Sequence, residues 1–220
     1  MGNTNTYFSA EQFVDKDTTA PKSFLALGDS YTIGESVPSS ERFPVQTVKY
    51  LQDQGINFSD PEIIAQTGWT TGNLLSALYS IAPTKSIYDI VTLLIGVNNQ
   101  YQRRTEQEYA DEFLTLLNKA IQYVGNNKKR VIVLSIPDYS VTPFASRSDK
   151  VLIAKEIDAF NAINKTISNH AGVNYLDTTA STRLAVNDLS LVANDGLHPS
   201  GREYKVWAEE LIPIIKTALQ

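Results

Sequence analysis

A serine, an aspartate and a histidine in this chain have the residue types and spacing of a nucleophile with its base. Ser30 follows the apolar run 24–27 and the pair Gly28–Asp29. Asp195 and His198 lie three residues apart near the other end of the chain. A serine hydroxyl is a weak nucleophile until a base takes its proton, and histidine is the base whose pKa suits neutral pH. A carboxylate must hold that histidine in one tautomer, which a tight turn from Asp195 to His198 allows.

Acyl transfer also needs hydrogen-bond donors for the oxyanion of its tetrahedral intermediate. The backbone N–H groups of Ser30 and Gly68, together with the Asn98 side chain, supply three candidates. The chain has two histidines, and His170 belongs to the last turn of a helix-length segment, where the helix dipole favours a cation. If this is a histidine-assisted serine enzyme, His198 is therefore its base by elimination.

These residues become neighbours only if strands and helices bring them together. Short apolar runs that predict buried strands occur at 24–27, 63–65, 90–95, 131–136 and 173–176. Amphipathic segments that predict helices occur at 43–54, 71–81, 105–124, 148–170 and 201–219. Apolar strands alternating with helices indicate one α/β domain, a three-layer α/β/α sandwich with a mainly parallel five-stranded sheet.

The segments that follow the predicted strands share one edge of that sheet, because parallel strands end on the same side. Ligands of such sheets bind beyond the carboxyl ends of the strands. The candidate serine, glycine and asparagine and the Asp–His pair all lie in these segments. One rim of the sheet therefore collects the parts of an acyl-transfer site.

Four short blocks in this order resemble those of the SGNH (GDSL-type) hydrolases, in particular bacterial members, and they span essentially the whole chain. They are GDSY at 28–31, QTGWTT at 66–71, GVNN at 96–99 and DGLHP at 195–199. The resemblance implies a flavodoxin-like fold and hydrolysis of esters or thioesters without a cofactor. It also implies that Ser30 is the nucleophile, that Gly68 and Asn98 are oxyanion donors, and that Asp195 and His198 form the acid–base pair.

Two residues depart from the pattern of that family. Tyr31 stands where the GDSL name expects Leu, a variation of little consequence. Asn99 stands where the third block usually has Asp, which removes a carboxylate next to the oxyanion donor and leaves open how the hydrogen bonds there are made.

Taken singly, these residues also fit structural roles. Ser30 could be a helix N-cap, Gly68 a glycine that the backbone conformation requires, and Asn98 a turn residue. A first loop that binds phosphate is the main competitor, but Asp29 would repel phosphate and no glycine-rich fingerprint occurs. That role would also leave the Asp–His pair unexplained.

Aromatic residues crowd the predicted rim. They could form an acyl pocket, stack on a sugar ring or pack beneath long loops, and they are Tyr31, Trp69, Tyr101, Tyr139 and Phe144. We expect a serine esterase for a small-molecule ester with a short acyl group, a lipid or an acetylated sugar as substrate. Two other functions remain open, namely a carbohydrate O-deacetylase or acetyltransferase with the same site, and a non-catalytic binding domain on the same fold.

Bulk properties narrow the classes of partner and cofactor. The 220 residues suit one domain, predicted at 23–220 after a polar extension at 1–22. A formal charge of −5 argues against nucleic acid as a partner, and without cysteine there is no thiolate metal site. We expect no metal and no membrane-spanning segment. The extension lacks the apolar segment of a signal peptide, so we expect a cytoplasmic protein, or a periplasmic or secreted one whose signal has been removed.

Overall fold

The parallel sheet predicted from the apolar runs is present in the computed structural model, which describes residues 20–220. Its five strands lie in the order β2-β1-β3-β4-β5, and every neighbouring pair is parallel. The strands are β1 (Phe24–Gly28), β2 (Glu62–Ala65), β3 (Ile90–Leu94), β4 (Val131–Leu134) and β5 (Asn174–Leu176). This is the flavodoxin-like strand order, in which the direction of winding switches between β1 and β3.

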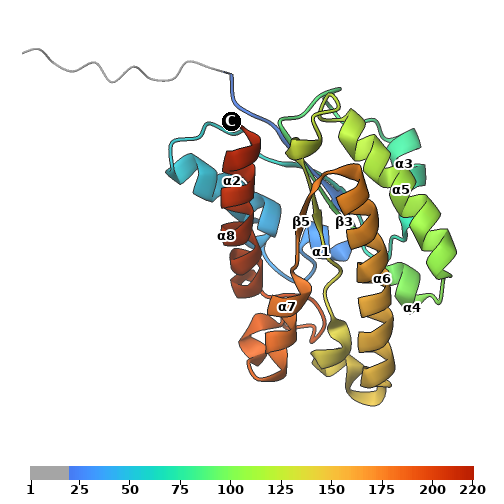
Figure 1. Cartoon of the computed structure of the whole chain (residues 1–220). Coiled ribbons are helices and arrows are strands. Elements are labelled where there is room, and N and C mark those ends of the chain that lie inside the picture. Colours follow the sequence, from blue (N-terminus) through green and yellow to red (C-terminus); the bar gives the residue numbers. More distant parts are fainter. Residues whose placement is uncertain (1–19) are drawn as a thin grey trace, which may run out of the picture.

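Helices cover both faces of the sheet and complete the expected three layers (Figure 1). On one face lie α2 (Phe43–Asp53) and α8 (Gly201–Ala218), and on the other lie α3 (Thr71–Ser80), α5 (Glu106–Gln122) and α6 (Lys150–Ala171). Three short helices are α1 (Ser30–Ile33), α4 (Val97–Tyr101) and α7 (Thr179–Thr182). Single 3₁₀ turns occur at Ser39–Glu41, Lys128–Arg130, Tyr139–Val141, Pro143–Arg147, Arg183–Val186 and Leu189–Leu191.

The apolar composition of the central strands follows from their burial. Every residue of β1, β3 and β4 is buried, because helices pack on both faces. An aromatic cluster joins the two helices of one layer, since the Phe43 ring of α2 lies 5.8 Å from the Trp207 ring of α8 and Tyr204 lies 5.0 Å from Trp207. The contact thus holds α8, at the carboxyl end of the chain, against α2, which follows α1.

Threonine side chains cap the N-termini of α5 and α3, two helices that follow loops at the carboxyl edge of the sheet. Thr105 accepts a 3.1 Å hydrogen bond from the Glu108 N–H at the start of α5, whereas the Glu108 carboxylate pairs with Arg104 at 3.4 Å. A reciprocal capping box, in which each side chain bonds the backbone N–H of the other residue, occurs at α3 between Thr70 and Asn73. The loop between β2 and α3 is therefore held at both ends by regular structure.

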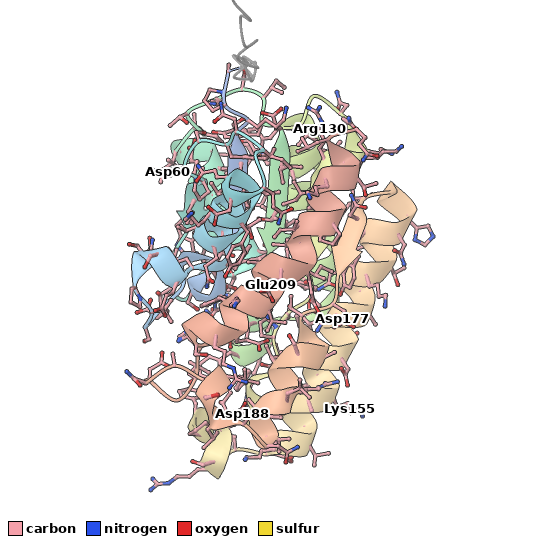
Figure 2. All side chains as sticks on the ribbon, turned by 90° about the vertical axis from the view of Figure 1, so that its left-hand side faces the viewer. Asp60, Arg130, Lys155, Asp177, Asp188 and Glu209 are labelled. Carbon is pink, nitrogen blue, oxygen red and sulfur yellow. The ribbon has the colours of Figure 1, made fainter. Side chains whose placement is uncertain are left out.

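The carboxyl ends of the strands lie at the lower end of the molecule in Figure 1, together with α4 and α7. In the side view of Figure 2, Asp188 marks this end, and Arg130, which precedes β4, lies at the opposite end. The predicted extension, residues 1–22, falls outside the described residues except for its last three. Of these, Lys22 forms a parallel bridge with Phe58. The domain limits at 23–220 stay a prediction.

Gly28 provides a test of how closely β1 must approach its neighbours. A Cβ atom at this position would collide with the Thr32 hydroxyl of α1 and with the Leu94 carbonyl of β3. We expect Gly28→Ala to lower the free energy of unfolding by about 3 kcal/mol, because backbone must shift to relieve the overlap. Urea unfolding measures this loss.

Gly172 is the matched control, since it has a φ of 76° and open space around its missing side chain. Gly172→Ala should cost only about 1 kcal/mol, the penalty of left-handed backbone for alanine. Equal small losses for both substitutions would contradict the close-packing argument.

Candidate active site

A chain of two hydrogen bonds joins the predicted nucleophile to the Asp–His pair. The Ser30 Oγ atom lies 2.9 Å from His198 Nε2, and His198 Nδ1 lies 2.6 Å from Asp195 Oδ2. The fold therefore brings together residues 168 positions apart. The imidazole is buried, with 7% of His198 exposed, so it is held between its two partners rather than free in solvent.

A tight loop holds Asp195 against the imidazole, as its spacing predicts. The Asp195 Oδ1 atom accepts hydrogen bonds from the Leu197 N–H at 2.9 Å and the His198 N–H at 3.0 Å. The base of the loop is closed by an antiparallel bridge between Val192 and Pro199. One carboxylate oxygen thus folds the turn and leaves the other for the ring.

The environment of Asp195 keeps its carboxylate ionised. Partial burial raises its pKa, but hydrogen bonds from the His198 ring, from the backbone N–H groups of Leu197 and His198 and from the Ser36 hydroxyl outweigh burial and lower the pKa to about 2. At neutral pH, Asp195 is therefore a hydrogen-bond acceptor that fixes the Nδ1–H tautomer of His198.

Asp29, rather than Ser30, caps the first helix. The Asp29 side chain accepts a 3.0 Å hydrogen bond from the Tyr31 N–H, and Ser30 is the first residue of α1. The interpretation of Ser30 as an N-cap is therefore wrong. The Ser30 hydroxyl points instead to His198, while Asp29, only 1% exposed, has the structural role of the cap.

The predicted oxyanion donors lie on the three segments that follow the adjacent strands β2, β1 and β3. Asn98, on α4, lines a cavity together with Ser30, and its Nδ2 donates to the Trp69 carbonyl at 3.0 Å. Gly68 lies in the turn that the Trp69 N–H closes on the Gln66 carbonyl, with a φ of 83°. Gly68 is not among the residues that line the cavity.

Both the oxygen and the nitrogen of the unusual Asn99 side chain have hydrogen-bond partners. Its Oδ1 accepts from the Thr71 N–H at 3.0 Å, and its Nδ2 donates to the Thr71 hydroxyl at 2.6 Å. That hydroxyl in turn donates to the Glu112 carboxylate of α5. Asn99 is fully buried and ties α4 to the first turn of α3, so the departure from the family pattern leaves the local hydrogen bonding intact.

The cavity beside Ser30 has a volume of about 150 Å³ and mostly apolar walls. Three of the lining rings pack on one another, with centroids 6.2–6.4 Å apart: Tyr101, Tyr139 and Phe144. The remaining lining residues are Tyr31, Val97, Asn98, Leu197 and His198. Four of the five predicted pocket aromatics therefore line the cavity. Trp69 does not, and instead packs against the hydrophobic core while half-buried.

A wide polar valley of about 810 Å³ adjoins the cavity. Tyr101 and Tyr139 line both hollows and form the wall between them. A hydrogen bond of 2.9 Å from the Tyr139 hydroxyl to Gln100 fixes this wall. The other side chains of the valley are largely polar or charged: Arg103, Arg104, Glu106, Ser148, Asp149 and Glu156, with Leu152, Ile153 and Phe160.

Within residues 20–220, no group of three or more His, Asp or Glu side chains is placed to hold a metal ion. In the same part of the chain, no helix combines the length and the apolar character that crossing a bilayer requires.

Comparison with known proteins settles the family. The model of the GDSL-like lipase/acylhydrolase family matches residues 26–206, which covers every block from GDSY to DGLHP. The chain belongs to that family. As a GDSL-like protein it is a hydrolase that acts on ester bonds. No curated protein matches the sequence.

Solved structures of low sequence identity share the fold of this GDSL-like hydrolase. TesA superposes with a TM-score of 0.70 at 17% identity, over 90% of this chain and all of TesA. A lipase/acylhydrolase from Enterococcus faecalis gives 0.72 at 17% identity, over 90% of this chain and 97% of its own. Axe2, an acetylxylan esterase from Geobacillus stearothermophilus, gives 0.67 at 18% identity, over 88% and 94%.

The buried Asp29 gives a prediction for pH dependence. Burial raises its pKa from 3.8 to about 7, against the opposing effect of backbone N–H groups that donate to it. Because the folded state then holds this proton more tightly than the unfolded chain, the stability it contributes is full below about pH 4 and is lost as pH rises through 7. In ¹³C NMR, one aspartate carboxyl should titrate near 7, and the signal should disappear in Asp29→Asn. Titration of every aspartate below pH 5 would contradict this.

Proposed function

We propose that this GDSL-like hydrolase is a serine esterase that works through a covalent acyl-enzyme. Ser30 is the nucleophile, His198 is the general base and acid, and Asp195 orients the imidazole. The observation that carries the proposal is the continuous hydrogen-bonded path from Asp195 through His198 to a serine hydroxyl at the wall of a cavity.

In the first half-reaction, Ser30 Oγ bonds to the ester carbonyl carbon while its proton passes to His198 Nε2. The carbonyl π electrons move to oxygen and form the oxyanion. When the carbonyl re-forms, the bond to the alcohol oxygen breaks and that oxygen takes the proton from Nε2. In the second half-reaction, water attacks the acyl carbon and passes a proton to His198 Nε2. The bond from that carbon to Ser30 Oγ then breaks, Oγ takes the proton back from Nε2, and the carboxylic acid leaves. The ionised Asp195 stabilises the imidazolium in both halves.

Three donors are proposed for the oxyanion. The Ser30 N–H belongs to the first residue of α1, where backbone N–H groups have no acceptor within the helix. An amide nitrogen carries two N–H donors, so the bond from Asn98 to the Trp69 carbonyl leaves one for the oxyanion. The Gly68 N–H is the third, which rests on the family pattern and on its place in the loop beside Asn98.

The size of the cavity favours a short acyl group. Its volume of about 150 Å³ is below the roughly 300–1,000 Å³ that sites for larger ligands provide. Three of the side chains that line it are rings packed against one another, which leaves little room for a long chain between them. We therefore propose acetyl and similarly short esters as the preferred substrates.

The central test is hydrolysis of p-nitrophenyl esters from acetate to decanoate by wild type and Ser30→Ala. Loss of the nucleophile should lower kcat by at least about 1,000-fold, because the other members of the site act through it. In the wild type, kcat/KM should be highest for acetate and fall with chain length. A serine-reactive phosphonate should label Ser30 and leave Ser30→Ala unlabelled. Full turnover by Ser30→Ala would refute the mechanism.

A carbohydrate O-deacetylase is a second candidate, and the polar valley favours it. The valley combines arginines with carboxylates and with the exposed Tyr101 ring, the mixture of hydrogen-bonding groups and aromatic surface that suits a sugar. It adjoins the short-acyl cavity, so it is placed to receive the alcohol half of an acetylated sugar. The fold shared with an acetylxylan esterase is consistent with this candidate.

Arg103 separates the two candidates, because it lines the valley but not the cavity. We expect Arg103→Ala to lower kcat/KM for acetylated xylo-oligosaccharides by about tenfold, the effect of losing hydrogen bonds from a charged donor. Its kcat/KM for p-nitrophenyl acetate should stay unchanged. Arg147→Ala, at an exposed arginine outside the valley lining, is the control. Equal rates on the sugar ester for wild type and Arg103→Ala would remove the support for a sugar-binding valley.

A further inference from the structure

A turn that no motif marks lies against three parts of the active site. It comprises residues 34–37, which follow α1 directly. The backbone N–H groups of Gly34 and Glu35 both donate to the Ser30 carbonyl. The Glu35 carboxylate accepts a hydrogen bond from the Thr67 hydroxyl, next to Gly68. This turn therefore contacts both the nucleophile's backbone and the loop of an oxyanion donor.

Ser36 connects the same turn to the acid of the site. Its hydroxyl donates to Asp195 Oδ2 at 2.7 Å, the oxygen that also accepts from His198 Nδ1. The remaining hydrogen bonds of Asp195 among the described residues come from Leu197 and His198, which belong to its own loop. Those bonds move with the loop, so the Ser36 hydroxyl is the one that sets Asp195 relative to the Ser30 side of the site.

Ser36 makes this contact from a strained backbone conformation. Ser36 has a φ of 65°, in the left-handed region that costs a non-glycine residue about 1 kcal/mol. A glycine there would relieve the cost but would carry no hydroxyl. The sequence keeps the strained serine at the point where its hydroxyl reaches the carboxylate.

We propose that Ser36 is a positioning residue, which holds Asp195 in the orientation that aligns His198 with Ser30. The proposal rests on the proposed function. In this proposal, the residue 34–37 turn sets the distance between Ser30 and the loop that holds Asp195 and His198. These two parts of the site come from opposite ends of the chain.

Two substitutions separate the hydroxyl from the backbone strain. Ser36→Ala removes the hydroxyl and keeps the strain, whereas Ser36→Gly removes both. We expect both variants to lower kcat for p-nitrophenyl acetate by about three- to tenfold, the effect of one lost hydrogen bond, with KM little changed. Urea unfolding should show Ser36→Gly to be the more stable of the two. Ser80→Ala, at an exposed serine that bonds within α3, is the control and should match wild type.

The acidic limb of the pH profile of kcat/KM is a second measurement. A purely structural effect of the substitutions would leave this limb at the same pH. Without the Ser36 donor, the Asp195 carboxylate binds the imidazolium more strongly, so the limb should shift to higher pH. Both Ser36 variants retain the other titratable residues around this pair, so a shift of the limb reports the lost hydroxyl. These residues are Glu35 on the turn, Tyr31 and Asp29 at α1, Tyr204 on α8 and Asp138 after β4.

A ¹³C NMR titration of the Asp195 carboxyl tests the same contact without a substrate. Its midpoint should rise by about half a pH unit in Ser36→Gly and Ser36→Ala, because a hydrogen bond to the ionised form is lost. In an Asp195→Ala background, adding Ser36→Ala should have no further effect on kcat. A full additional loss there would overturn the proposal.

The remaining outcomes are equally decisive. Wild-type kcat and an unmoved Asp195 titration in both Ser36 variants would overturn the positioning role. So would recovery of wild-type kcat in Ser36→Gly alone, since the backbone and not the hydroxyl would then matter. Retained turnover in Ser30→Ala would refute the proposed function itself, whereas an inactive Ser30→Ala with normal Ser36 variants would refute only this inference.

Discussion

The reversal of the chain at the end of β1 is the constraint on which the site depends. β1 lies between β2 and β3, and Gly28 allows α1 to start directly against the strand. Asp29 then caps α1 from a buried position through its bond to the Tyr31 N–H. Burying this carboxyl is costly, as its raised pKa shows, but the cap makes Ser30 the first helical residue. Ser30, the proposed nucleophile, is thus held by rigid backbone between the loops that follow β2 and β3.

The Asp195–His198 half of the site is positioned by the packing of α8 on α2, which lies away from the reacting groups. Asp195 and His198 are held together by their own turn, but that turn must be brought to Ser30 by what surrounds it. α8 begins just after the turn and packs on α2 through the Phe43–Trp207 contact. On its other side, the Phe144 N–H donates to the Gly196 carbonyl at 2.9 Å. The aromatic core between α2 and α8 therefore determines where the imidazole lies.

The parts of this structure that sequence reasoning reached are those with a local or periodic signal. The apolar runs predicted all five strands. In the central strands β1, β3 and β4, burial on both faces demands such runs. Residue type and order were enough to select Ser30, Asp195 and His198 as neighbours. Contacts without such a signal were missed, as with Ser36 and Asp195, which are 159 residues apart and belong to no recognisable pattern. Trp69 was expected in the pocket, but ring type alone does not say which way a loop side chain turns.

Asn99 shows why a departure from a family pattern has to be judged by its surroundings. Its amide bonds the Thr71 backbone and hydroxyl, and that hydroxyl donates onward to Glu112. An aspartate at 99 would have no N–H for the Thr71 oxygen, and one hydroxyl proton would then serve two carboxylates. Like charges repel, so an aspartate here would place a second carboxylate against the hydroxyl that Glu112 already shares. The neutral amide avoids this conflict while it still holds α3 against α4, which keeps Asn98 beside the cavity. With Glu112 in place, asparagine is therefore the residue that suits this position, and its presence gives no reason to regard the site as inactive.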